Sequence, residues 1–182
     1  MLQMAYSSAR HHINMYCNEK KNNNSFDRAK SAAFTGHRYY DFSRKEIIRQ
    51  RLSRAIVEAY DNGIRNFISG FATGIDLMAA QTVQSLKLSH PGMVLTAAIP
   101  FRGQAGRFKP HDRRCYDELI EKADEVIVLS EHYYPRCFLD RDEFMVCNAA
   151  QIIAYYDGRE RGGTYYTIRK AREMGISVTN LY

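Results

Sequence analysis

Residues 66–80 change from the pattern of a buried strand to that of a helix across two glycines. The stretch NFISGFATGIDLMAA begins with apolar residues, breaks at Gly70 and Gly74, and continues in helix-forming residues. Such a change is typical of a strand that passes into a helix through a tight turn in an α/β protein. Glycine permits the sharp turn, and the free N–H groups at the start of the helix can bind an anion. The stretch therefore predicts an α/β fold with a turn that a ligand can approach closely.

The rest of the chain repeats this alternation of apolar runs and amphipathic segments. We expect strands at about residues 32–34, 64–69, 93–99, 125–130, 151–156 and 176–179. We expect helices at about residues 43–61, 73–88, 112–122, 139–149 and 164–174, the first of them begun by a capping box of Ser43 and Glu46. Continuous apolar strands that alternate with helices predict a doubly wound, mostly parallel sheet, a Rossmann-like three-layer sandwich.

The length of 182 residues predicts one domain with a sizeable core. Residues 1–30 are polar and show no sustained hydrophobic period, so we interpret them as an N-terminal extension with at most a short helix near residues 9–17, and residues 31–182 as the single domain. No run approaches the roughly 18 apolar residues of a membrane span, and the N-terminus has no signal-peptide pattern. We therefore expect a cytoplasmic protein without a membrane partner.

Charge and motifs exclude several classes of protein. The net charge of +6 permits a nucleic-acid partner without demanding one, because most basic residues are interleaved with acidic ones. The patterns GxxxxGK[ST], HExxH, GxSxG and GxGxxG are absent, which disfavours a classical ATPase, zincin, α/β-hydrolase or NAD dehydrogenase. The four cysteines form no CxxC pair, and no cysteine–histidine set has metal-ligand spacing, so we expect no metal and no cofactor.

Two further stretches have the same strand-then-small-residue form, TGHR at residues 35–38 and GGT at residues 162–164. Because ligands bind at the carboxyl ends of parallel strands, we expect all three stretches to meet at one site. The two glycines of the last stretch could wrap backbone N–H groups around a phosphate, or could be a flexible loop before a threonine N-cap. The predicted ligand- and phosphate-binding residues are Thr35, Gly36, His37, Arg38, Ser69, Gly70, Thr73, Gly74, Asp76, Arg141, Gly162, Gly163 and Thr164.

Three residues are candidate catalytic residues, and the sequence does not decide among them. His37 could act as a general acid or base, could contact a nucleotide, or could be structural. Asp76 lies in the first turn of its predicted helix, where it could stabilise the helix dipole, accept hydrogen bonds from ribose hydroxyls, or act as a base. Asp157, at the end of the predicted strand at residues 151–156, has the same alternatives.

Taken together, six motifs in order resemble the YpsA-like branch of the SLOG superfamily, which joins the DNA-processing protein DprA with the LOG phosphoribohydrolases. They are FTGHR at residues 34–38, SGFATGID at 69–76, AIPF at 98–101 with Gln104, RDEFM at 141–145, YDG at 156–158 and GGT at 162–164. The resemblance covers about residues 32–178. It implies a Rossmann-like fold with a pocket for a nucleotide or a nucleotide derivative at the carboxyl ends of the strands.

One departure from the family pattern bears on enzymatic activity. LOG enzymes carry a PGGxGTxxE pattern whose glutamate assists cleavage of an N-glycosidic bond. In the segment of this chain that resembles it, Thr167 stands in place of the glutamate and Arg161 in place of the proline. Threonine has no acid or base of useful pKa. LOG-type hydrolysis by this residue is therefore doubtful, although Asp76 or Asp157 could substitute.

We rank three functions. The first is a module that binds a nucleotide or an ADP-ribose-like derivative, and senses or sequesters it. The alternative is an enzyme that cleaves an N-glycosidic or phosphate bond. The third is DprA-like binding of single-stranded DNA through a basic, aromatic-containing loop with Arg102, Arg107, Lys109, Arg113 and Arg114. Paired tyrosines at 133–134, 155–156 and 165–166 are consistent with a homo-oligomer or with ordinary packing.

Overall fold

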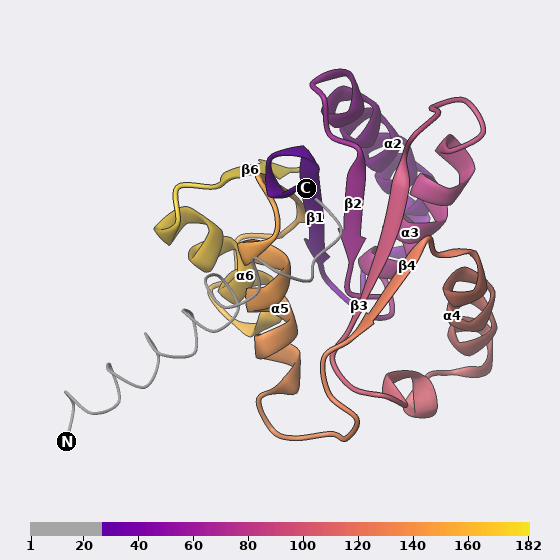
Figure 1. Ribbon diagram of the computed structural model, residues 1–182. Helices are drawn as coiled ribbons and strands as arrows, with labels where there is room; N and C mark the ends of the chain where they lie inside the picture. Colours follow the sequence, from indigo (N-terminus) through magenta and orange to yellow (C-terminus); the bar gives the residue numbers. More distant parts are fainter. Residues whose placement is uncertain (1–26) are drawn as a thin grey trace.

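The computed structural model describes residues 27–182 and contains a six-stranded parallel sheet in the order β4-β3-β2-β1-β5-β6 (Figure 1). The strands are β1 (Ser31–Gly36), β2 (Asn66–Ser69), β3 (Val94–Ile99), β4 (Glu125–Val128), β5 (Gln151–Tyr155) and β6 (Ser177–Asn180). The helices are α2 (Lys45–Asp61), α3 (Ile75–Leu86), α4 (Pro110–Lys122), α5 (Cys137–Cys147) and α6 (Gly162–Glu173). Short 3-10 turns are η1 (Arg28–Lys30), η2 (Phe42–Arg44) and η3 (Gln104–Arg107).

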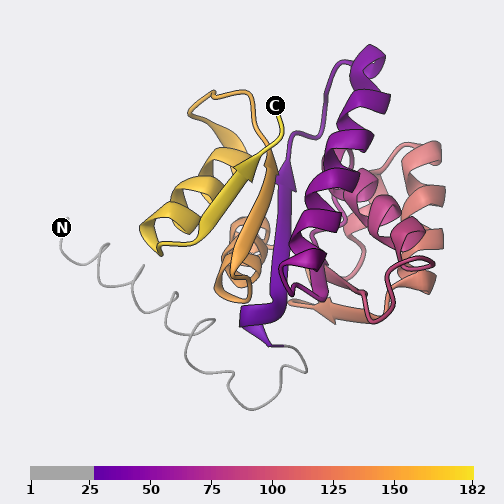
Figure 2. The same cartoon turned by 90° about the horizontal axis from the view of Figure 1, so that it is seen from above.

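Helices cover both faces of the sheet, as Figure 2 shows from above. Helices α2, α3 and α4 pack on one face, where Phe34 and Leu95 are fully buried. Helices α5 and α6 pack on the other face, where Ile68 and Ile152 are fully buried. Successive strand residues point to opposite faces, and both faces are apolar, which explains the continuous apolar runs. The prediction of a Rossmann-like three-layer sandwich with a parallel sheet is confirmed.

The chain reverses its direction across the sheet at one place. From β1 it proceeds through β2 and β3 to the edge strand β4, and then returns to the other side of β1 for β5 and β6. The strands β1 and β5 are therefore neighbours whose following loops turn away from each other. In a doubly wound sheet this switch point opens a crevice outside the carboxyl ends of the strands. The loop that begins at His37 and the loop that begins at Tyr156 lie on the two sides of it.

The predicted capping box at the start of α2 is wrong. Ser43 lies inside η2, where its Oγ donates to Oδ1 of Asp41 at 2.8 Å and its backbone N–H donates to the same oxygen at 3.0 Å. Helix α2 begins at Lys45, and the preceding Arg44 makes no side-chain cap. An aspartate two residues before the serine thus occupies the hydroxyl that would have capped the helix.

The predicted extension, residues 1–30, and its short helix near residues 9–17 lie almost entirely outside the described residues. Residues 28–30 form η1 and contact the domain: Nε of Arg28 donates to the Ala149 carbonyl at 3.3 Å, and the Lys30 carbonyl accepts from the Arg65 backbone at 2.8 Å. Over residues 27–182, no helix is both long and apolar enough to cross a membrane.

Candidate functional site

His37 and Asp157 join the loops on the two sides of the switch point. Nε2 of His37 lies 3.0 Å from Oδ1 of Asp157 and 3.1 Å from the backbone nitrogen of Asp157. A neutral imidazole that carries its proton on Nδ1 accepts from this N–H, whereas a protonated imidazole pairs with the carboxylate. The backbone N–H of Arg159, with help from the charge of His37, holds the pKa of Asp157 below its usual value. This contact therefore fixes the ring in either protonation state.

The turn after β2 is held by its own serine. The Ser69 hydroxyl donates to the Asp76 carbonyl at 3.0 Å and accepts from the backbone N–H of Phe71 at 3.2 Å. Phe71 has a φ of 51°, a left-handed conformation that is costly for a bulky residue and persists only where the surrounding contacts hold it. Ser69 is fully buried, and both hydrogen bonds of its side chain lie within residues 69–76. Its side chain therefore holds the turn in place from inside the domain.

The loops after β1 and β2 pack directly on one another. Gly74 has a φ of +86°, and a Cβ there would lie 2.5 Å from the Arg38 carbonyl oxygen and 2.6 Å from that of His37. The His37 carbonyl also accepts from the backbone N–H of Ile75 at 3.3 Å. A Cβ at Gly36 would in turn lie 2.5 Å from the Cβ of Ile75. These glycines are needed because the first two predicted stretches meet with no room for a side chain.

Arg141, on α5, connects the turn after β2 to two carboxylates. Its Nη1 donates to the Gly70 carbonyl at 2.5 Å and lies 3.8 Å from Oδ2 of Asp76, and its Nε donates to Oδ1 of Asp142 at 2.8 Å. The side chains of Arg141 and Asp76 are 6% and 9% exposed, and that of Asp142 is 13% exposed. Gly70 has no space for a Cβ, because Arg141 and Asp76 already occupy it.

This cluster holds one buried guanidinium with one buried carboxylate, that of Asp76, and one partly buried carboxylate, that of Asp142. Burial raises the pKa of Asp76 to about 6, against the opposing effect of Arg141. Burial also raises the pKa of Asp142, although Arg141 favours its charged form. Arg38, exposed at the rim, acts on both carboxylates from a greater distance. With both aspartates ionised the buried cluster carries an excess negative charge, which is costly unless hydrogen-bond donors or protons neutralise it.

Asp142 extends the cluster to the start of α6, where the third predicted stretch lies. A Cβ at Gly163 would lie 3.3 Å from Oδ2 of Asp142. The Thr167 hydroxyl donates to the Gly163 carbonyl at 2.9 Å, and it lies near enough to Asp142 to favour the charged form of that carboxylate and so lower its pKa. Gly162 and Gly163 are exposed in the first turn of the helix, which begins two residues before the predicted Thr164, and no side chain caps it. The backbone N–H groups of this first turn therefore lack a side-chain cap.

The structure places the predicted site residues around one region, in different environments. Exposed at the rim are Arg38, Gly162 and Gly163; partly buried are Gly36, His37, Thr73, Gly74 and Asp157; buried are Thr35, Ser69, Gly70, Asp76, Arg141 and Thr164. Asp142 was not among the predicted site residues. It lies within the RDEFM motif at residues 141–145, but the motif does not say which of its side chains face the site, and only the packing of α5 against α6 brings Asp142 there.

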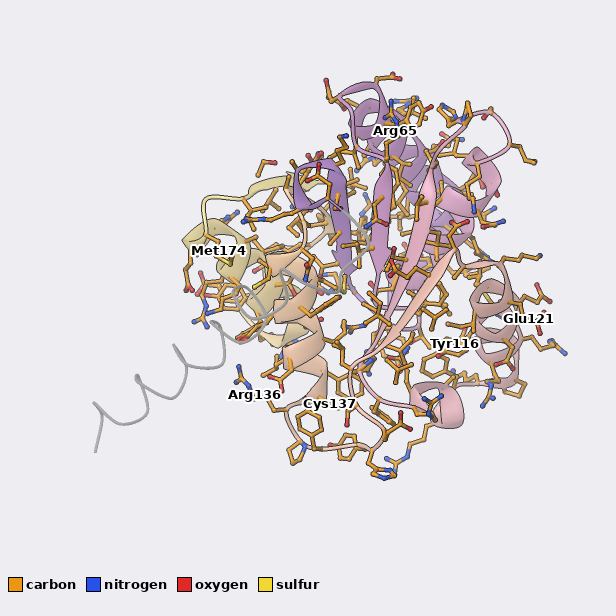
Figure 3. The ribbon with its side chains drawn as sticks, in the orientation of Figure 1. Arg65, Tyr116, Glu121, Arg136, Cys137 and Met174 are labelled. Carbon is orange, nitrogen blue, oxygen red and sulfur yellow. The ribbon has the colours of Figure 1, made fainter. Side chains whose placement is uncertain are left out.

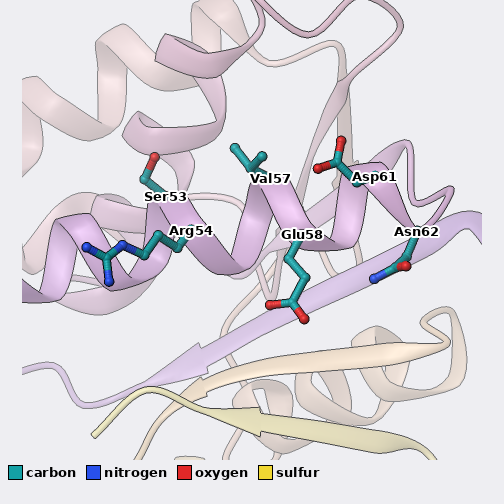
Figure 4. A pocket seen from close by; sticks show the side chains of 6 residues that line it. All are labelled: Ser53, Arg54, Val57, Glu58, Asp61 and Asn62. Atoms are coloured by element: carbon teal, nitrogen blue, oxygen red, sulfur yellow. The ribbon is translucent and has the colours of Figure 1, made fainter.

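Other surface features lie apart from this region. A shallow depression on the outer surface of α2 is lined by Ser53, Arg54, Val57, Glu58, Asp61 and Asn62 (Figure 4). It lies on the half of α2 that leads into the start of β2, at the opposite edge of the sheet from the strand carboxyl ends. Within the described part of the chain, no group of three or more His, Cys, Asp or Glu residues is arranged to hold a metal ion.

Comparison with known proteins gives one family and one recurring fold. The family model YpsA, described as the YspA SLOG family, matches residues 32–178. A UPF0398 protein of Bacillus cereus (strain ATCC 14579) and one of Bacillus thuringiensis (strain Al Hakam) are each 25% identical over 132 residues, 71% of this chain and 72% of the relative.

Two solved structures of DNA processing protein A (DprA) share the fold. The Streptococcus pneumoniae protein has a TM-score of 0.60 at 20% identity, over 84% of this chain and 50% of its own. The Helicobacter pylori protein, described by its single-stranded DNA binding mode, has a TM-score of 0.57 at 16% identity, over 82% of this chain and 64% of its own. The chain therefore spans half to less than two thirds of each DprA protein.

Proposed function

This chain belongs to the YpsA SLOG family, and from that premise we propose that it binds a nucleotide or a nucleotide derivative, such as an ADP-ribose-like molecule, at the carboxyl ends of β1, β2 and β5. In this proposal the protein senses or sequesters the ligand. The site is the switch point of the sheet, the usual ligand position in a doubly wound fold.

The observation that carries the proposal is the excess of buried carboxylates around Arg141. Asp76 and Asp142 share this one buried guanidinium, at 3.8 Å and 2.8 Å. Ionised carboxylates only accept hydrogen bonds, so a ligand that supplies donors would satisfy their remaining acceptor positions. The neighbouring hydroxyls of a ribose are donors of this kind, and Asp142 is the carboxylate with more exposure to meet them.

The start of α6 supports the phosphate part of the same ligand. The N–H groups of the first turn of a helix attract anions, and the exposed glycines there allow close approach. Asp142 borders this turn on one side. We therefore place the phosphate at the first turn of α6, beside Gly162 and Gly163, and the ribose against the exposed side of the Asp142 carboxylate.

Thermal unfolding in the presence of AMP, ADP-ribose, NAD and cyclic AMP tests the proposal. At least one of them is expected to raise the Tm, since a ligand present at about 100 times its Kd adds roughly 2.7 kcal/mol to stability. Gly163→Val is expected to remove this shift, because a branched side chain there meets Asp142 and covers the first turn of α6. Gly106→Val is the control, since open space surrounds Gly106. If millimolar amounts of all four ligands leave the Tm unchanged, the proposal is wrong.

A second candidate function is cleavage of an N-glycosidic or phosphate bond. The contact that favours it is between Asp142 and Thr167: a carboxylate, supplied by α5, lies beside the threonine that occupies the place of the LOG glutamate. Burial raises the pKa of Asp142, and a carboxyl that keeps its proton can donate it to a leaving group. Incubation with a nucleotide panel, followed by chromatography for free base and free phosphate, tests this function. Turnover that survives in Asp142→Asn would exclude Asp142 as the acid.

A further inference from the structure

Three aromatic rings form one cluster at the carboxyl ends of β3 and β4. Phe101 follows β3, Tyr133 follows β4, and Phe138 lies in the first turn of α5. The ring centroid of Phe101 lies 5.5 Å from that of Tyr133 and 5.9 Å from that of Phe138. The ring centroids of Tyr133 and Phe138 are 6.4 Å apart. Tyr133 is 61% exposed. We call Phe101, Tyr133 and Phe138 the ring platform.

Arg38 connects the ring platform to the switch point. Its guanidinium carbon lies 5.2 Å from the centroid of the Phe138 ring. Arg38 follows His37 directly in the loop after β1, and its charge acts on Asp76 and Asp142. A planar guanidinium on an aromatic ring is held by cation–π attraction and offers a second flat, cationic surface.

The ring platform is also one turn of helix away from Arg141. Phe138 and Arg141 are three residues apart on α5, so they are neighbours on its surface, about 4.5 Å apart along the helix axis. Figure 1 shows the start of α5 at the same end of the molecule as the loops after β3 and β4, and Figure 3 labels Arg136 and Cys137 there. The polar cluster of Arg141, Asp76 and Asp142 therefore ends where the ring platform begins.

We propose that the ring platform and Arg38 bind the planar base of the ligand, so that the site takes a nucleotide with a heteroaromatic base rather than a sugar phosphate. This inference rests on the proposed function, because it assigns the part of the ligand beyond the ribose. The exposed Tyr133 ring is held at 77° to Phe101 and at 59° to Phe138, and every base has a π-face that can stack on such a fixed ring. Arg38 adds a positive charge suited to an anionic nucleotide.

Calorimetric titration with AMP and with ribose 5-phosphate tests the inference. The protein is expected to bind AMP at least about tenfold more tightly than ribose 5-phosphate, the difference that one stacked base provides. Tyr133→Ala and Phe138→Leu are each expected to weaken AMP binding about tenfold and to leave ribose 5-phosphate binding unchanged. Tyr39→Ala is the matched control, because Tyr39 is 84% exposed in the loop after β1 and lies outside the ring platform.

The outcomes separate this inference from the proposed function. Binding of neither AMP nor ribose 5-phosphate overturns this inference, whereas the proposed function is wrong only if ADP-ribose, NAD and cyclic AMP also fail to bind. Equal affinity for the two, or AMP binding that Tyr133→Ala leaves unchanged, overturns the ring platform alone. A Tyr133→Ala variant that loses affinity for an oligothymidylate while it keeps its affinity for AMP would assign the rings to a DNA strand and would also overturn the inference. Circular dichroism spectra of the variants must match the parent, and Tyr133→Ala, which removes an exposed ring, meets this condition most readily.

Discussion

Asp76 on α3 and Asp142 on α5 differ from ordinary surface aspartates because both lie beside the guanidinium of Arg141 inside the domain. At the scale of single residues, the contacts of each side chain with its immediate neighbours set its role. Ser69 serves the turn, Gly70 leaves room for Arg141, and His37 is held by Asp157.

The pH dependence of stability should report the burial of Asp76. Its pKa is raised from 3.8 to about 6 because burial disfavours the charged carboxylate, so the folded chain holds this proton more tightly than the unfolded chain. The stabilising contribution is fully present below about pH 4 and is lost as the pH rises through about 6. Asp76→Asn is expected to remove up to about 3 kcal/mol of the loss that the parent shows between those values, measured by urea unfolding.

Asp157→Asn provides the contrast in the same titration. Its folded pKa is lowered, so its contribution is present at neutral pH and is lost on acidification, the opposite sign to that of Asp76. An Asp76→Asn variant whose unfolding free energy follows the parental pH dependence would show that Asp76 is not buried as a carboxylate in the folded chain.

Gly70→Ala should be strongly destabilising for a steric reason. The methyl group would occupy the space of the Arg141 guanidinium and of the Asp76 carboxylate, so Arg141 would lose its bond to the Gly70 carbonyl. We expect a loss of about 2–4 kcal/mol in the free energy of unfolding, against at most about 0.5 kcal/mol for Gly106→Ala. Denaturant unfolding measures both, and similar values for the two variants would contradict the packing described.

At the scale of elements, α5 and α6 form one wall of the site and are joined by a polar network. Tyr166 on α6 donates its hydroxyl to Oε1 of Glu143 on α5, and Arg136 donates to the same oxygen at 2.6 Å. Glu143 is 2% exposed, and burial together with its carboxylate raises the pKa of Tyr166 to about 12. Since α5 carries Arg141 and α6 carries the glycine turn, this network sets the position of one against the other.

Tyr166→Phe is therefore expected to loosen the wall. Loss of the hydroxyl leaves the buried Glu143 with fewer donors, which should cost about 1–3 kcal/mol of stability. Tyr165→Phe, which keeps a ring in place to stack on Tyr156, is the control and should cost less. Hydrogen exchange at the start of α6 should accelerate in Tyr166→Phe, and unchanged exchange there would argue that other contacts hold the two helices.

At the scale of the whole molecule, the sequence predicted the sheet and the sequence positions of its strands and helices. Apolar runs such as those of β3 and β5 need two covered faces, and their alternation with amphipathic segments leaves few other folds. It also indicated which turns meet, because strand carboxyl ends share one edge. The burial of Asp76 and the role of Asp142 were not predictable in this way. Both depend on how α5 packs, which no local pattern encodes.

The distribution of charge bears on DNA binding, the third function in our ranking. In the basic loop, Arg102 makes two bonds to Glu131, at 2.6 and 2.9 Å, and Arg113 pairs with Asp117 at 2.9 Å. Phe108 packs against Tyr116 instead of standing free. Of the five basic side chains that the sequence suggests for a strand, Arg107, Lys109 and Arg114 remain outside these pairs.

The salt dependence of DNA affinity measures how many basic side chains of this loop contact a nucleic acid. A strand held by three cations should show a plot of log affinity against log salt with a slope no steeper than about −2, at about −0.7 per phosphate contacted. We therefore expect an oligothymidylate to bind weakly, with a slope in this range, when fluorescence anisotropy is measured over a series of KCl concentrations. Arg107→Gln should reduce the slope by about 0.7, whereas Arg102→Gln should reduce it by less, because Glu131 already neutralises Arg102. A slope much steeper than −2, or an equal effect of the two substitutions, would mean that the ion pairs open and that the whole loop tracks the strand.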